Sequence, residues 1–246
     1  MIYAGDTSVI DALDNKEEVL KNGYDDSNTD YTQIGTSAYN LTQVDNAYVG
    51  YMYGTPGSST YKETHANINN STVKEIVDEW YEKHIKGTEY ENYLSDTLFC
   101  NDRSFASSNT GTGVGTSTTY YRTYDTDNHT LYCKNQNDRF TINDEAKGNG
   151  DLTYPIGLVT ADEAYLSGGY SATNSKYYLY TGNSYWTMTP YYVGSNGISF
   201  VWDISKDLVG NFQVSYTYNG VRPVINLRSD ALKQGSGTAD DPFMVY

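Results

Sequence analysis

The clearest periodic pattern in the chain lies between residues 71 and 86. Apolar side chains recur there at the three- and four-residue spacing of a single helix face, with charged side chains between them. Ser71 is a favourable N-cap, and Gly87 is a favourable residue just beyond the last turn. The pattern therefore predicts one amphipathic helix that buries its apolar stripe. The stripe consists of Val73, Ile76, Val77, Trp80, Tyr81 and Ile85.

A second, shorter helix is predicted by residues 160–163, which have the sequence TADE. Thr160 followed three residues later by Glu163 has the pattern of a capping box, in which each residue satisfies the other's backbone N–H. We expect this helix over about residues 161–166, ended by the glycine pair at 168–169. Residues 9–20 carry a weaker helical pattern, and residues 104–130 have the Gly- and Ser-rich composition of a long surface loop.

Short runs of β-branched and aromatic residues, separated by turn residues, predict strands along the rest of the chain. Helices early and many short strands late indicate an α+β domain. The predicted strands are residues 48–54, 97–100 (strand or loop), 152–159, 177–180, 185–189, 197–203, 212–218, 221–227 and 243–245.

Composition describes a folded chain with a polar surface. The 246 residues include 38% hydrophobic and 15% aromatic residues, and 27 of them are tyrosine. Disordered chains are poor in aromatics, so the chain folds. Tyrosine is a preferred contact residue of binding surfaces, although it also serves as a half-buried strand residue. The net charge of −15 repels phosphate backbones, which makes nucleic acid an unfavourable partner.

The ends and the hydropathy of the chain bear on its location. No run of about 18 apolar residues exists, so we expect no membrane span. The first residues, 1–3, lead straight into polar sequence without the pattern of a signal peptide. Either the protein stays inside a cell or particle, or the chain is part of a longer secreted protein, and we favour the second.

Two cysteines, Cys100 and Cys133, leave two interpretations. They form a disulfide or they are two buried free thiols. A disulfide across these 33 positions would stabilise the fold by roughly 3–4 kcal/mol in the chain-entropy model. A structural zinc site is disfavoured, because it needs three or four ligands and no CxxC motif is present.

Four segments together resemble a known fold family. They are residues 96–103, 154–163, 185–190 (YWTMTP) and 220–227 (GVRPVINL). Their order is similar to an uncharacterised bacterial domain family in the formylglycine-generating-enzyme branch of C-type-lectin-like folds. That family occurs on surface and prepilin-associated proteins, and the fold also carries the variable proteins of diversity-generating retroelements. The resemblance covers roughly residues 46–246.

The resemblance implies a fold and a domain organisation. We expect an α+β domain of the C-type-lectin-like fold, formylglycine-generating-enzyme type, with short twisted antiparallel sheets, two helices and long loops. Residues 46–246 form this domain, and residues 1–45 form an N-terminal extension packed on it. In such a fold Trp186 is a core residue. Arg222 is a structural cation whose planar fork clamps carbonyls or a carboxylate.

The stretch between these two residues is where the resemblance places a ligand-binding face. It mixes aromatic rings with short polar side chains, as do the diversified positions of retroelement variable proteins. The whole chain is rich in the same residues. The candidate ligand-binding residues are Tyr191, Tyr192, Asn196, Phe200, Trp202, Asp203, Phe212, Tyr216, Tyr218 and Asn219. Phe200 and Trp202 must share a sheet face, and one face is core, so part of this set is structural.

Enzymatic chemistry is disfavoured. Formylglycine-generating enzymes bind copper through a C-terminal cysteine pair, and no cysteine follows Cys133. The three histidines, His65, His84 and His129, have no neighbouring nucleophile motif such as GxSxG. Acidic residues are numerous, but solvated surface charge explains them better than a paired-carboxylate glycosidase site. Calcium is a candidate cofactor at residues 125–128 (DTDN) or 149–151 (NGD), although neither completes an EF-hand loop.

The sequence therefore predicts a non-enzymatic, secreted or cell-surface module that binds a protein or carbohydrate ligand on another cell or particle. A variable protein of a diversity-generating retroelement is one form of this hypothesis. One alternative is a structural or pilus-associated subunit that self-assembles through its tyrosine-rich face. A less favoured alternative is an enzyme of the formylglycine-generating type with altered chemistry.

Overall fold

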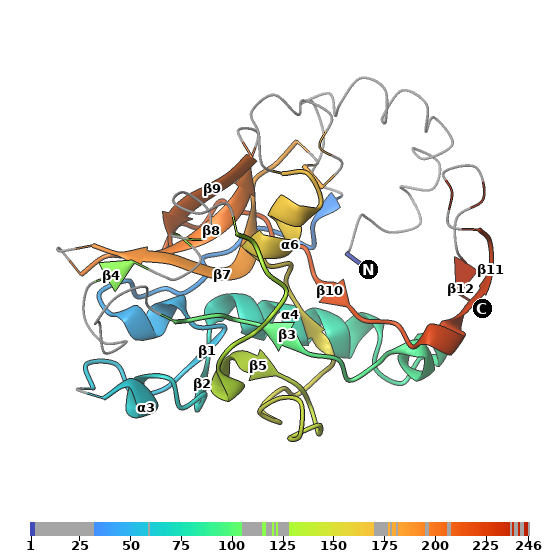
Figure 1. The fold of residues 1–246 in the computed structure, drawn as a ribbon, viewed down its shortest axis with the longest axis horizontal. Coiled ribbons are helices and arrows are strands. Elements are labelled where there is room, and N and C mark those ends of the chain that lie inside the picture. The colour runs from blue at the N-terminus through green and yellow to red at the C-terminus, as the bar shows by residue number, and fades with distance from the viewer. Residues whose placement is uncertain are drawn as a thin grey trace.

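A computed structural model describes most of the protein. Within the described part the fold is mixed α+β, with few helices and several small antiparallel sheets, which confirms the predicted class at this level. Figure 1 shows the largest sheet on one side of the long helix α4. The described residues are 1–2, 32–58, 60–104, 115–116, 120, 122, 128–169, 177, 179–180, 182–194, 197–205, 208–236, 238, 241 and 244–245. The weak helical pattern at 9–20 lies outside them.

Helix α4, Thr72–His84, is the amphipathic helix that the sequence predicts. Its N-cap is Ser71, whose side-chain oxygen accepts a hydrogen bond from the Lys74 backbone N–H at 3.2 Å. The predicted apolar stripe is buried at Val73, Val77 and Tyr81, which places the helix against the main core.

Helix α6, Ala161–Leu166, begins with the predicted capping box. The Thr160 hydroxyl accepts from the Glu163 backbone N–H at 3.1 Å, and the Glu163 carboxylate accepts from the Thr160 backbone N–H at 2.8 Å. Shorter helical segments connect the strands. They are α3 (Tyr61–Thr64), η2 (Asn46–Val49), η3 (Glu89–Tyr93), η5 (Gln136–Asp138) and η6 (Ser229–Ala231).

The largest sheet has four antiparallel strands in the order β4-β7-β8-β9. The two middle strands agree with two predicted ones. The edge strand β9 does not: it begins before the predicted 212–218 and ends at 213, because Tyr216 N–H turns back to the Gln213 carbonyl at 2.9 Å. The strands are β4 (Gly115–Thr116), β7 (Tyr185–Val193), β8 (Ser199–Ser205) and β9 (Leu208–Gln213).

The described residues also form four two-stranded antiparallel sheets. Two predicted strands, 152–159 and 221–227, are much shorter here because the prolines at 155 and 223 have no N–H for a ladder. The predicted strand at 177–180 is wrong in its described part, where Tyr180 N–H turns back to the Tyr177 carbonyl. The pairs are β1 (Met52–Tyr53) with β2 (Asn69–Asn70), β3 (Phe99–Cys100) with β5 (Arg139–Phe140), β6 (Ile156–Gly157) with β10 (Val224–Ile225), and β11 (Leu232–Gln234) with β12 (Met244–Val245).

Two hydrophobic clusters cover the two faces of the four-stranded sheet. Trp186 and Val201 belong to the cluster that includes helix α4. Tyr185 and Trp202 belong to the cluster that includes helix α6. Because side chains alternate along a strand, neighbouring residues of β7 and β8 enter different clusters, and the middle of the sheet is buried on both sides.

The described part of the N-terminal segment, residues 32–45, is built into this body. The Ile34 N–H donates to the Val221 carbonyl at 2.9 Å. Tyr39 is fully buried in the main core, and its ring meets the Trp186 ring edge-on with centroids 5.8 Å apart. The main core therefore includes residues from before position 46.

A disulfide joins Cys100, in β3, to Cys133, with the two Cα atoms 5.8 Å apart. Cys133 is buried, and the bond ties β3 to the segment that leads into η5. The alternative of two free thiols therefore does not hold.

Arg103 is the centre of a buried polar network close to this disulfide. Its Nε donates to Asp138 Oδ1 at 2.7 Å. Its Nη1 donates to the Met52 carbonyl at 2.9 Å, and its Nη2 donates to Asn67 Oδ1 and the Asn137 carbonyl, both at 2.9 Å. One side chain thus fixes several loops and short strands to one another.

Candidate functional site

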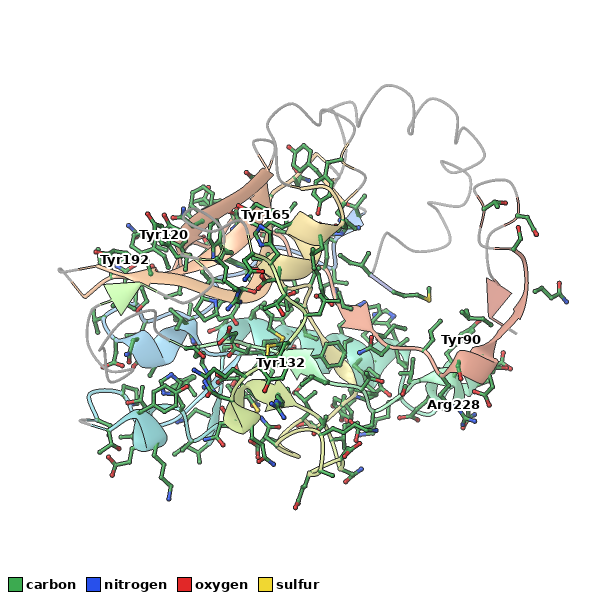
Figure 2. The ribbon with its side chains drawn as sticks, viewed as in Figure 1. Tyr90, Tyr120, Tyr132, Tyr165, Tyr192 and Arg228 are labelled. Atoms are coloured by element: carbon green, nitrogen blue, oxygen red, sulfur yellow. A yellow bond between two sulfur atoms is a disulfide. The ribbon has the colours of Figure 1, made fainter. Side chains whose placement is uncertain are left out.

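Two groups of aromatic side chains lie at one end of the four-stranded sheet: Tyr192 with Phe200, and Phe212 with Tyr216 and Tyr218. The register pairs Phe200 with Gln213 and Phe212 with Val201, so the Phe200 and Phe212 side chains leave the sheet on opposite faces. Ring centroids are 6.3 Å apart for Tyr192 and Phe200, 4.5 Å for Phe212 and Tyr216, and 5.5 Å for Tyr216 and Tyr218. Phe200 and Phe212 line one shared groove. Tyr218 is 75% exposed, and Phe212 and Tyr216 are each 37% exposed. We call Phe212, Tyr216 and Tyr218 the aromatic patch; Figure 2 labels Tyr192, which belongs to the other group.

The local fold turns these rings outward. Val214 is fully buried, and its N–H donates to the Ser199 carbonyl at 3.0 Å. With residue 214 fixed inward, the turn closed by Tyr216 N–H and the Gln213 carbonyl brings the Tyr216 ring back over Phe212. The two rings stack with an interplanar angle of 11°.

The groove beside the aromatic patch has a volume of about 530 Å³, and none of its lining residues within the described part of the chain is charged. Its other lining residues are Asn211, Gln213 and Ser215. The Ser215 hydroxyl donates to Gln43 Oε1 at 2.7 Å. Within the described part of the chain neither the Asn211 nor the Gln213 side-chain amide has a hydrogen-bond partner, so both can serve a ligand. Flat rings beside amides are the usual chemistry of surfaces that bind sugars or peptides.

Three of the predicted ligand-binding residues lie in the interior instead. Trp202 and Asp203 have no exposed surface, and Asn219 is 1% exposed. Trp202 does share a sheet face with Phe200, but Tyr165 of helix α6 covers that face at Trp202, with ring centroids 6.2 Å apart. The prediction that these three side chains contact a ligand is therefore wrong for this structure.

Asp203 and Asn219 form a buried polar pair. Asn219 Nδ2 donates to Asp203 Oδ2 at 3.5 Å, and Asp203 Oδ1 has no partner among the described residues. Burial raises the pKa of the Asp203 carboxyl to about 7. This pair belongs to the interior of the sheet.

Tyr191 and Asn196 complete the predicted set. Tyr191 is half-buried, and its ring lies against Trp202 at 4.6 Å and Tyr120 at 5.3 Å. It therefore faces the α6 cluster, and its ring also meets the Tyr192 ring with centroids 6.3 Å apart. Asn196 lies outside the described residues.

The two residues predicted to be structural are both buried. Trp186 has no exposed surface, and its indole N–H donates to the Ser37 carbonyl at 2.8 Å. Arg222 is 2% exposed, donates from Nη1 to the Leu179 carbonyl at 2.7 Å, and lies over the Tyr185 ring at 4.6 Å.

A second hollow, which no sequence pattern predicts, lies beside the disulfide. This disulfide pocket has a volume of about 290 Å³ and is bounded by β3, residues 130–132, the start of helix α6, β7 and β10. Arg122 enters it between two carboxylates: Nη2 donates to Asp162 at 2.7 Å and Nη1 to Asp102 at 3.0 Å. The capping box predicts where Asp162 lies along its helix, but nothing local relates it to an arginine 40 positions away.

The histidines serve packing in this structure. Each stacks on an aromatic ring: His65 on Tyr61, His84 on Trp80 and His129 on Tyr165. Burial, with a further contribution from nearby Arg103, lowers the pKa of His65 to about 3. His65 is therefore neutral at physiological pH.

The candidate calcium ligands are occupied where the structure describes them. Asn149 Oδ1 accepts from the Asp151 N–H at 3.0 Å, and Asp151 Oδ2 accepts from Asn67 Nδ2 at 2.9 Å. Residues 125–127 are outside the described part. Among the described residues there is no group of three or more His, Cys, Asp or Glu side chains that could hold a metal ion. Calcium binding stays a prediction.

Comparisons with known proteins give no family. No protein-family model matches the chain, and neither a curated protein nor a solved structure matches it. None of the helices that the structure describes is long and apolar enough to cross a membrane.

Proposed function

We propose that the protein is a non-enzymatic recognition module whose ligand-binding face is the aromatic patch. The observation that carries the proposal is the cluster of exposed rings of Phe212, Tyr216 and Tyr218 beside a groove whose described lining residues are uncharged and include the amides of Asn211 and Gln213. Aromatic side chains bury much area at low entropic cost, and amide hydrogen bonds orient the ligand. The face is smaller than the one the sequence predicts, because its buried members are excluded.

The proposed ligand is a protein or a carbohydrate on another cell or particle. The described lining of the groove is uncharged, which favours a neutral group, and the net charge of −15 disfavours nucleic acid. The proposed setting is secreted or at a cell surface. The proposed fold is the C-type-lectin-like fold of the formylglycine-generating-enzyme type, supported by the order of the four sequence segments. A retroelement variable protein is one member of that class.

The experiment is a binding screen with the fluorescently labelled protein on a glycan microarray and on a panel of intact bacterial cells. The double variant Phe212→Ala/Tyr216→Ala is screened beside it. Tyr90→Ala is the matched control, since Tyr90 is 55% exposed and lies far from the sheet, near Arg228 (Figure 2). The proposal requires signals that the double variant loses and the control keeps. Signals that survive in both variants would place binding elsewhere.

A self-assembling structural subunit is the second candidate. The observation that favours it is that the aromatic patch adjoins β9, and no described residue pairs with the outer edge of this strand. Open edges and exposed rings both promote association. Light scattering across a concentration series decides between the two: a monomer at all concentrations rejects assembly, whereas growing mass that Phe212→Ala abolishes supports it.

A further inference from the structure

The disulfide pocket is a preformed cavity separate from the aromatic patch. The disulfide between Cys100 and Cys133 fixes one wall. The Arg122 guanidinium, held by Asp102 on one side and Asp162 on the other, fixes another. Both carboxylates are buried, so these ion pairs are shielded from solvent. Because a covalent bond holds one wall and ion pairs hold another, the cavity is already formed before a ligand binds.

One part of the pocket is apolar and open to solvent. Phe99, Leu158 and Val224 supply apolar wall, and Phe99 and Leu158 are buried. Leu131 is 67% and Tyr132 is 68% exposed, so these two lining residues mark the mouth (Tyr132 is labelled in Figure 2). A ligand body that enters here removes apolar surface from water on both sides of the contact.

The other part of the pocket is negative. Asp102, Asp162 and Glu163 line it against the single guanidinium of Arg122. The α-ammonium of Met1 lies near Glu163: burial lowers its pKa, and the Glu163 carboxylate opposes that shift. Among the described residues, three carboxylates therefore meet two cations and the His129 imidazole, whose Nδ1 lies 3.5 Å from Asp162 Oδ1.

Glu163 is the carboxylate best placed to receive a new partner. Its Oε2 accepts from the Thr160 N–H and hydroxyl, both at 2.8 Å. Its Oε1 has no hydrogen-bond partner within the part of the chain that is described. The capping box therefore orients the carboxylate and leaves one oxygen for a ligand.

From these features the geometry points to a binding site for a small organic ammonium ion. Its body, of about five carbons, packs on Leu158 and Val224, and its ammonium donates to Glu163 Oε1. The volume of about 290 Å³ suits a ligand of this size rather than a large cofactor. The site is independent of the aromatic patch, so either proposal can fail alone.

The test compares three probes of one shape: pentylammonium, 1-pentanol and pentanoate. Affinities are measured by calorimetry on the full chain, and methyl NMR of Leu158 and Val224 reports whether each probe enters the pocket. We expect pentylammonium to bind about tenfold more tightly than 1-pentanol, the scale of one charge-assisted hydrogen bond. Pentanoate is expected to bind most weakly.

Glu163→Gln is the decisive variant, because the glutamine carbonyl keeps the capping-box hydrogen bond, while its NH2 group replaces Oε1 and so removes both the charge and the acceptor offered to the ammonium. It should lower pentylammonium affinity about tenfold and leave 1-pentanol unchanged. Glu89→Gln, on the exposed η3, is the matched control for non-specific attraction to an acidic protein. Equal affinities for the three probes, unmoved Leu158 and Val224 methyl signals, or equal losses in the two variants would overturn the assignment.

Discussion

The guanidinium of Arg103 and the carboxylate of Asp138 form an ion pair, Nε to Oδ1 at 2.7 Å, in which both side chains are almost completely buried. The low-dielectric interior makes such a pair costly to break, because the remaining charge loses both its partner and its water. The pair therefore stabilises the loops around it only while it is complete.

Arg103→Ala should lower the free energy of unfolding by about 3–5 kcal/mol, because it leaves Asp138 charged and unpaired. The matched control is Arg228→Ala at the exposed pair of Arg228 and Asp230, joined at 2.6 Å, where the loss should stay below about 1 kcal/mol. Urea unfolding measures both. Similar losses in the two variants would contradict the role given to burial.

The Asp203 carboxyl should make stability depend on pH. Its folded pKa of about 7 lies above that of the unfolded chain, so folding favours the protonated form. Its contribution is complete below about pH 4 and is lost as the pH rises through about 7. Asp203→Asn removes this titration and keeps an oxygen for Asn219.

The measurement is the free energy of unfolding of wild type and Asp203→Asn at pH 5 and pH 8. From pH 5 to pH 8, the free energy of unfolding of the variant should rise by about 2–3 kcal/mol relative to that of wild type. Subtracting the wild-type value from the variant value at each pH cancels the contributions of the other titrating groups, which both proteins share. A constant difference across the range would show that Asp203 does not titrate as its burial implies.

The disulfide of Cys100 and Cys133 should stabilise the fold by roughly 3–4 kcal/mol, as expected when a bond closes 33 positions of chain. Urea unfolding with and without a strong reductant measures this. The double variant Cys100→Ser/Cys133→Ser serves as the control. Its free energy of unfolding should equal that of the reduced wild-type protein and should not change when the reductant is added. A wild-type protein that the reductant leaves unchanged would contradict the prediction.

Local patterns in the sequence predict the elements whose causes are local. Helix α4 follows from a 3.6-residue period with Ser71 at its start, and α6 follows from the box between Thr160 and Glu163. Strands β7 and β8 follow from runs of β-prone residues. The end of β9 was missed because Tyr216 and Tyr218 have strand preference but lie after a turn.

The candidate site depends on contacts that sequence spacing does not contain. The alternation of side chains along a strand predicts that Phe200 and Trp202 share one face of the sheet. It does not predict that helix α6 covers that face at Trp202 only. The clamp of Arg122 by Asp102 and Asp162 joins residues 20 and 40 positions apart. Such long-range pairs depend on how the elements pack together, so no local sequence pattern predicts them.

The central claim is that the aromatic patch binds the ligand. Its most direct test is the affinity of single variants Phe212→Ala and Tyr216→Ala for the strongest hit of the glycan and cell screen, by biolayer interferometry. Each should lose about tenfold or more, as truncated aromatic contacts at binding hot spots do, while Tyr90→Ala stays at the wild-type value. Wild-type affinity in both patch variants would contradict the claim.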